Sequence, residues 1–149
     1  MATLLESVIN YFQSDEWPIE LANGNIRTAF QGENGQWTCH GWIREEEKQF
    51  VFYSLCPLKV PEGRCPDVSE FVTRANYGMV IGNFEIDLND GELRYKTSID
   101  IEGGELSLGM FRQLVVTNVM IMDRYLPGIM AVITGAQSPA QAIAQIEAH

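Results

Sequence analysis

Two segments of alternating apolar and polar residues, separated by Asp90-Gly91, constrain the fold more than any other part of the chain. The alternation runs from Asn83 to Leu88 and again from Leu93 to Ile101, with the period of a β-strand. Asp-Gly is a preferred loop of tight hairpins. We therefore expect the two segments to pair as antiparallel strands through a two-residue turn.

This turn fixes the register that we predict for the hairpin. It gives the pairs Leu88–Leu93 and Ile86–Tyr95 on one face, and Asp87–Arg94 and Glu85–Lys96 on the other. A slip of one residue would exchange the faces and separate the opposite charges. Cross-strand pairs of opposite charge stabilise a sheet by about 0.2–1 kcal/mol each. We interpret the charges as a solvated sheet face rather than as catalytic groups.

Helical spacing and turn residues define the other predicted elements. They are a helix at 4–14 capped by Thr3 and Glu6, strands at 18–21, 26–31, 36–44 and 49–56, a helix capped by Asp67 and Glu70 and ended by Gly78, a long helix from Ser107 to Thr134 and a short helix from Ser138. Pro127 should kink the long helix, because it removes the hydrogen bond to the Asp123 carbonyl. The order α-β-β-β-β-α-β-β-α-α predicts an α+β fold, with an antiparallel sheet of about five to six strands packed against helices, in one domain spanning 1–149.

The hairpin at 36–56 has two apolar faces. With its tip at Glu46 and Glu47, one face carries Trp37, Cys39, Gly41, Ile43, Phe50, Phe52 and Cys56, and the other carries Thr38, His40, Trp42, Val51, Tyr53 and Leu55. A sheet with one solvated face alternates more cleanly than this. The second face is therefore either covered by a helix or used by a partner.

The long helix has a similarly wide apolar stripe. Its main row is widened by a second one, formed by Met110, Leu114, Ile121 and Tyr125. Such width suggests burial on two sides. The predicted partner-binding residues are this second row together with His40, Trp42, Val51, Tyr53 and Leu55.

Charge and composition exclude several classes of partner. The formal net charge is −10 and the ten basic residues are scattered, which argues against nucleic acids and anionic membranes. In the apolar stretch 114–133, Asp123 and Arg124 would each cost about 2.5–3.5 kcal/mol at mid-bilayer, so we predict no transmembrane span. The N-terminal residues lack a basic region followed by a cleavage site, and three cysteines without C-x-x-C fit reduced thiols. We therefore expect a cytoplasmic protein.

The common catalytic and cofactor motifs are absent from the sequence: it contains no G-x-S-x-G, no P-loop, no H-E-x-x-H and no G-x-G-x-x-G. Cys39 and His40 are neighbours on a predicted strand and point to opposite faces, so they cannot form a thiolate–imidazole pair. We expect no catalytic residues, no cofactor and no metal.

Several motifs resemble the bacterial YbjN family of sensory transduction regulators. They are Arg74-Ala75-Asn76-Tyr77-Gly78, Gly82-x-Phe84-Glu85-Ile86-Asp87, Asp90-Gly91-Glu92-Leu93-Arg94-Tyr95-Lys96, Met122-Asp123-Arg124-Tyr125-Leu126-Pro127 and Ser138-Pro139. The resemblance is concentrated between about residues 71 and 142. It implies a curved antiparallel sheet packed on helices, like that of type III secretion chaperones, and commonly a homodimer. It also implies regulation or protein binding, without catalytic residues to carry over.

Two functions from different classes remain open, and a purely structural homodimerisation through the long helix or the sheet face is compatible with either. The first is a non-enzymatic protein-binding module, a chaperone-like or regulatory adaptor with an unknown partner. The second is a small-molecule sensor or enzyme with a pocket between the long helix and the sheet, near Trp37, Cys39 and Phe52. The absence of a catalytic constellation and the second apolar sheet face favour the first.

Overall fold

The computed structural model describes residues 2–148. Its six-stranded sheet has the order β1-β2-β3-β4-β6-β5, and all neighbouring strands are antiparallel. The elements are α1 (Leu4–Ser14), β1 (Glu20–Ala22), β2 (Asn25–Gln31), β3 (Gln36–Arg44), β4 (Gln49–Leu55), a short 3-10 helix η1 (Glu62–Arg64), α2 (Cys65–Asn76), β5 (Asn83–Ile86), β6 (Leu93–Asp100), α3 (Leu108–Thr134) and α4 (Pro139–Glu147). The predicted α+β class and order of elements are confirmed.

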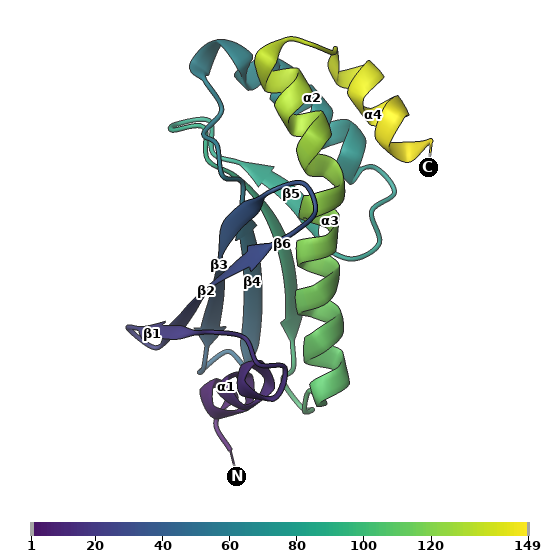
Figure 1. Cartoon of the computed structure of the whole chain (residues 1–149). Coiled ribbons are helices and arrows are strands. Elements are labelled where there is room, and N and C mark those ends of the chain that lie inside the picture. The colour runs from purple at the N-terminus through teal and green to yellow at the C-terminus, as the bar shows by residue number, and fades with distance from the viewer. Residues whose placement is uncertain (1, 149) are drawn as a thin grey trace.

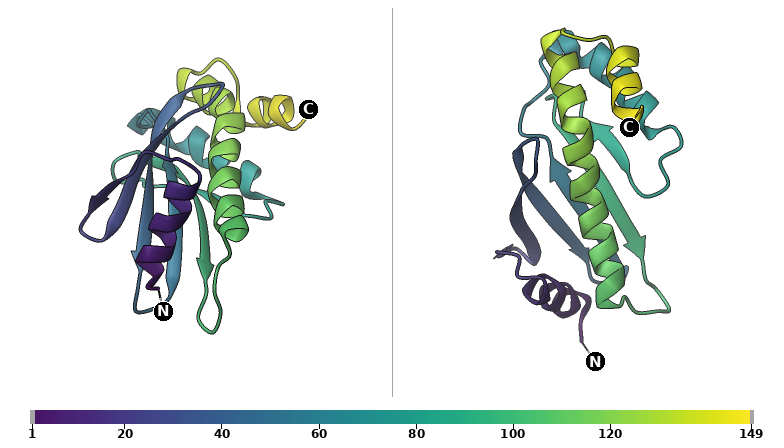
Figure 2. Two further views of the ribbon diagram at one scale, coloured as in Figure 1. Left: turned by 60° about the horizontal axis from the view of Figure 1, so that its bottom comes forward. Right: turned by 45° about the vertical axis from the view of Figure 1, so that its right-hand side comes forward.

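The helices α1, α2 and α3 pack on one face of the sheet (Figure 1). α3 runs along β4 and β6, α1 crosses the end of the sheet near the N-terminus, and α2 lies against β5. Aromatic rings fill the space between the layers. The ring centroid of Phe52 is 5.9 Å from that of Phe12 in α1, and Phe50 is 5.6 Å from Phe111 in α3. α4 packs on α2 and α3 (Figure 2).

The register predicted for the hairpin of β3 and β4 is confirmed. Its pairs include Arg44–Gln49, Ile43–Phe50 and Trp42–Val51. The charged tip and the alternation agree here, so local sequence is enough to fix the pairing. The inward row lies under α1 and α3, where Trp37, Cys39, Phe50 and Phe52 are buried and Ile43 and Cys56 are partly buried.

The hairpin of β5 and β6 has a different register from the predicted one. The observed pairs Ile86–Leu93, Glu85–Arg94 and Phe84–Tyr95 differ from it by two residues. The predicted pairs Leu88–Leu93, Ile86–Tyr95 and Asp87–Arg94 are therefore wrong. Because the shift is even, the strand residues keep their predicted faces, whereas Leu88 leaves the sheet and is 67% exposed.

A contact with the segment before η1 explains the longer loop of this hairpin. The N–H of Val60 donates to the carbonyl oxygen of Gly91 (2.8 Å), and the N–H of Gly91 donates to that of Asp87 (2.7 Å). Gly91 has a φ of +79°, and a Cβ there would lie 2.2 Å from the Val60 oxygen. This tertiary hydrogen bond outweighs the preference of Asp-Gly for a two-residue turn.

The start of α2 also differs from the prediction. The helix begins at Cys65, with Pro66 in its first turn, and follows η1 directly. Asp67 therefore lies inside the first turn instead of capping it, and Glu70 pairs with Arg74 (2.8 Å). The reason is that proline suits the first turn of a helix, where its missing N–H has no partner to lose.

α3 continues through Pro127, and the turn between β2 and β3 supplies a hydrogen bond in place of the one that the proline cannot donate. Pro127 cannot donate to the carbonyl oxygen of Asp123, which accepts a hydrogen bond from Asn34 Nδ2 instead (2.9 Å). The Asp123 carboxylate accepts the N–H groups of Glu33 (3.0 Å) and Asn34 (2.8 Å). Gly32 lies so close that a Cβ there would be 2.3 Å from Asp123 Oδ1. We call these contacts the Asp123 clamp, which holds the turn between β2 and β3 against α3.

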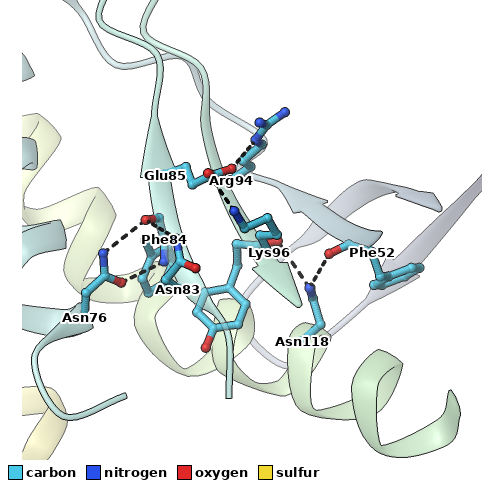
Figure 3. A network of polar contacts seen from close by, with 9 residues as sticks. Phe52, Asn76, Asn83, Phe84, Glu85, Arg94, Lys96 and Asn118 are labelled. Atoms are coloured by element: carbon cyan, nitrogen blue, oxygen red, sulfur yellow. Dashed lines mark hydrogen bonds and ion pairs between the residues drawn. The ribbon is translucent and has the colours of Figure 1, made fainter. Parts of the chain in front are cut away.

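A second buried polar side chain lies one and a half turns earlier on α3. Asn118 Nδ2 donates to the carbonyl oxygens of Phe52 (2.9 Å) and Tyr95 (3.2 Å), which belong to adjacent strands (Figure 3). The side chain is fully buried. One amide thus joins α3 to both β4 and β6.

By length and composition, α3 is apolar enough to cross a membrane, with a mean hydropathy of 1.2 over its most apolar window. Half of that window is buried inside the protein. Its hydropathy reflects its place between the sheet, α1, α2 and α4, as in the core helix of a soluble protein.

Replacing Gly91 by alanine should destabilise the fold more than replacing Gly103. Both glycines have left-handed φ angles (+79° and +84°), but a Cβ at Gly103 meets no atom within 4 Å. We expect Gly103→Ala to cost about 1–2 kcal/mol, and Gly91→Ala to cost more because of the Val60 contact. Urea denaturation measures both. Equal costs would contradict the role assigned to Val60.

Asp123→Ala should lower the free energy of unfolding by about 1–3 kcal/mol, because two backbone N–H groups lose their acceptor. Glu33→Ala is the matched control, since it removes an exposed side chain and keeps the N–H that the clamp uses. Chemical denaturation of both variants tests the clamp. If the two variants unfold at the same denaturant concentration, the carboxylate does not hold the turn.

Candidate functional site

Five of the predicted residues lie together on the sheet face opposite α1 and α3. They are His40, Trp42, Val51, Tyr53 and Leu55, and we call the surface that they form the open face. His40 pairs with Tyr53 and Trp42 with Val51 across β3 and β4. Of the helices within residues 2–148, none lies over this face (Figure 1).

A cationic side chain covers part of the open face. Arg94 of β6 crosses the ring of Tyr53, with Cζ 4.1 Å from the ring centroid. Val51 and Tyr53 are 8% and 9% exposed, whereas Trp42 is 41% exposed. Arginine stems bury apolar surface while their charged ends stay in water. The open face is therefore closed partly by its own side chains, and Trp42 is its most exposed apolar residue, although Arg44 Cζ lies 5.0 Å from its ring centroid.

Glu85 holds this cover in place. Its carboxylate contacts Arg94 Nε at 2.9 Å and Lys96 Nζ at 3.0 Å (Figure 3). Burial pushes the pKa of Glu85 upward, but the hydrogen bonds and charges of Lys96 and Arg94 outweigh it and bring the pKa below its usual value. The carboxylate is therefore ionised at neutral pH, and it keeps Arg94 beside Tyr53.

A shallow hollow of about 370 Å³ lies on the open face. Its lining residues are Asn25, His40, Gly41, Trp42, Tyr53, Leu55, Glu92 and Arg94. Burial lowers the pKa of His40, and the charge of Arg27 on the neighbouring strand lowers it further. The hollow is thus lined by a mostly neutral imidazole, an indole and an arginine, which can contact both apolar and polar side chains.

The four residues predicted on α3 lie on the other side of the sheet, so they do not join the open face. Met110 is exposed, and Leu114 and Ile121 are half-buried. Tyr125 is buried, its hydroxyl donates to Glu147 of α4 (3.0 Å), and its ring contacts Phe71 of α2. Tyr125, predicted as a partner-binding residue, is thus covered within the chain itself, because α2 and α4 pack over the C-terminal half of this row.

The pocket of the alternative function is filled by side chains. Trp37, Cys39 and Phe52 are buried, and the rings of Phe12 and Trp17 lie 5.9 Å and 6.5 Å from that of Phe52. Burial raises the pKa of the Cys39 thiol to about 12, so it is not a thiolate at neutral pH. In the described part of the chain, no group of three His, Cys, Asp or Glu residues could hold a metal ion.

The loop between α2 and β5 was missed as a surface feature. Tyr77 and Val80 are almost fully exposed, and Ile81 is also exposed. The sequence signal was the apolar run between Gly78 and Gly82, both of which have left-handed φ angles. Apolar residues bounded by two such glycines have no regular element to bury them.

The pKa of His40, measured by NMR, should lie below the ordinary histidine value of about 6.5. Arg27→Gln should raise it, because a nearby positive charge disfavours the imidazolium. The unfolded chain binds a proton at His40 more readily than the folded chain, so the free energy of unfolding should fall as the pH drops below about 6.5. The variant His40→Gln should lack that part of the pH dependence. A pKa at or above the ordinary value would contradict the burial of this ring.

Solved structures with this fold include the following two. YbjN from E. coli, a "putative transcription regulator", is 8% identical with a TM-score of 0.65, covering 91% of this chain and 95% of its own. ExsC, in its complex with ExsE, is 11% identical with a TM-score of 0.55, covering 85% of this chain and 96% of its own. At these identities the likeness concerns the fold, and it confirms the predicted chaperone-like architecture.

The sequence itself gives the closer classification. No curated protein sequence matches the chain significantly. A family model does match, over residues 4–130: YbjN, described as "putative bacterial sensory transduction regulator". This range spans most of the 149 residues and includes every element from α1 to the greater part of α3. The chain therefore belongs to the YbjN family.

Proposed function

We propose that this chain is a non-enzymatic protein-binding module, a chaperone-like or regulatory adaptor that receives its partner on the open face. The observation that carries the proposal is the exposed indole of Trp42 beside Val51 and Tyr53, on a sheet face without a helix in the described structure. Tryptophan, tyrosine and arginine dominate the energetics of protein interfaces. The open face brings these three residue types together.

The comparisons support this proposal. ExsC has the same fold and is in complex with another protein, ExsE. The YbjN family carries the description of a regulator. We extend the proposal to a cytoplasmic protein that acts as a homodimer on an unidentified protein partner. The small-molecule alternative lacks its expected pocket, because aromatic rings occupy that space.

The proposal is tested by recovering partners from native lysate with the tagged full chain. Trp42→Ala should reduce the recovery of the enriched partner. For the purified pair, calorimetry should show affinity weakened by about tenfold, as expected for an interface tryptophan. Leu88→Ala is the matched control, because Leu88 is an exposed apolar residue in the loop of the β5–β6 hairpin, outside the open face.

The outcome against the proposal is equally specific. If Trp42→Ala and Tyr53→Ala both keep the affinity of the wild-type chain, while circular dichroism confirms their fold, the open face is not the binding surface. Recovery of no protein partner from any lysate would reject the adaptor itself.

A further inference from the structure

Half of β6 is a free edge of the sheet. β4 pairs with β6 as far as Asp100, whereas β5 pairs only with residues 93–96. Figure 2 (right) shows β6 continuing past the end of β5, with no strand on its outer side. The sheet therefore lacks about half an edge strand at this corner.

The free edge presents backbone hydrogen-bonding groups. The carbonyl oxygen of Leu93 accepts from the N–H of Cys56, and the N–H of Ile101 donates to Lys48, so the odd-numbered residues of β6 bond to β4. Backbone groups alternate in direction along an antiparallel strand, and those of Ser98 and Asp100 consequently point outward. Within residues 2–148 these two residues have no strand partner on that side. Such groups are a template for an additional strand.

The side of α3 next to this edge also lacks a cover. Met110, Leu114 and Ile121 occupy the same side of the helix as Tyr125. Phe71 of α2 packs against Tyr125, but α2 ends before it reaches the N-terminal half of α3. Of this row, Tyr125 is therefore buried, whereas the residues from Met110 to Ile121 are at least partly exposed, beside the unpaired half of β6. A single bound segment can cover both the free edge of β6 and this side of α3.

The charge at this corner indicates what kind of segment fits. Asp100, Glu102 and Glu105 are exposed around the end of β6. The nearby cations are paired with carboxylates, because Lys96 is bound by Glu85, and Lys48, whose carbonyl oxygen accepts the N–H of Ile101, is bound by Glu45. If the same edge of a second copy paired here, the acidic ends of the two β6 strands would lie near one another, and like charges across a sheet are destabilising. A basic occupant avoids this repulsion.

We infer that the free edge of β6 binds an extended segment of another protein in which apolar and basic residues alternate. The segment pairs with Ser98 and Asp100 as a strand. Its basic side chains lie on the same side as the Asp100 carboxylate, and its apolar ones face Ile99 and the uncovered side of α3. In strand addition, main-chain hydrogen bonds supply affinity and alternate side chains supply specificity. The inference rests on the proposed function and places a second contact outside the open face.

The test uses the full chain and a labelled peptide, Lys-Val-Lys-Val-Lys-Val-Lys, followed by fluorescence anisotropy and amide NMR. We expect binding, with slowed hydrogen exchange at Ser98 and Asp100. N-methylation of the peptide's backbone at its lysine residues removes the N–H donors that face Ser98 and Asp100. It should weaken binding about tenfold or more. Asp100→Asn should weaken it about two- to fivefold, as for one exposed cross-strand charge pair.

Further variants separate this inference from the open face. Trp42→Ala should leave peptide binding unchanged, and Ser98→Pro should abolish it, because it removes an edge N–H that β4 does not use. The peptide series decides the question even if Ser98→Pro does not fold. Unchanged binding of the N-methylated peptide, loss of binding in Trp42→Ala, or no binding to the wild-type chain would overturn the inference.

A second copy is the rival occupant, and light scattering tests it. A dimer that Ser98→Pro or Asp100→Pro converts to a monomer would show that this chain itself fills the edge, which also overturns the inference. A different result would contradict the proposed function: a natural partner that binds the Trp42→Ala variant as tightly as the wild-type chain.

Discussion

Two polar side chains of α3, Asn118 and Asp123, determine where the helix lies on the sheet. Apolar packing alone allows a long helix to slide by a turn at small cost, because one apolar row resembles the next. A buried hydrogen bond does not allow this, since every lost partner leaves an unsatisfied group. Asn118 is bound to carbonyl oxygens of two strands, and Asp123 is bound to the turn between β2 and β3. The position of α3 is therefore fixed relative to β4 and β6 and also relative to the turn between β2 and β3.

Local sequence was sufficient for the elements whose partners are close along the chain. The β3–β4 register followed from the alternation around a charged tip, and the caps at Thr3, Ser107 and Ser138 followed from short motifs. It was wrong at the start of α2, where Pro66 lies in the first turn, and at a hairpin loop where a distant segment intervenes. The loop of the β5–β6 hairpin is set by Val60, some thirty residues earlier, and no local pattern contains that contact.

The candidate site shows the same division. Alternation placed His40, Trp42, Val51, Tyr53 and Leu55 on one face, and the structure brings them together there. Periodicity also grouped Tyr125 with Met110, Leu114 and Ile121, because they share one side of α3. It could not indicate that α2 and α4 cover only the C-terminal half of that side. The open face and the row on α3 are consequently separate surfaces, on opposite sides of the sheet.

The way in which Arg94 lies across Tyr53 has a kinetic consequence. A helix over the open face would have to move aside before anything reached the ring, and such motions take microseconds or longer. The guanidinium needs only a change of side-chain rotamer, which takes picoseconds to nanoseconds, and its partly exposed ion pair with Glu85 resists this by about 1 kcal/mol. Access to the ring is therefore fast compared with the diffusional encounter of two proteins. The association rate at this face is then set by collision and orientation, and not by a conformational gate.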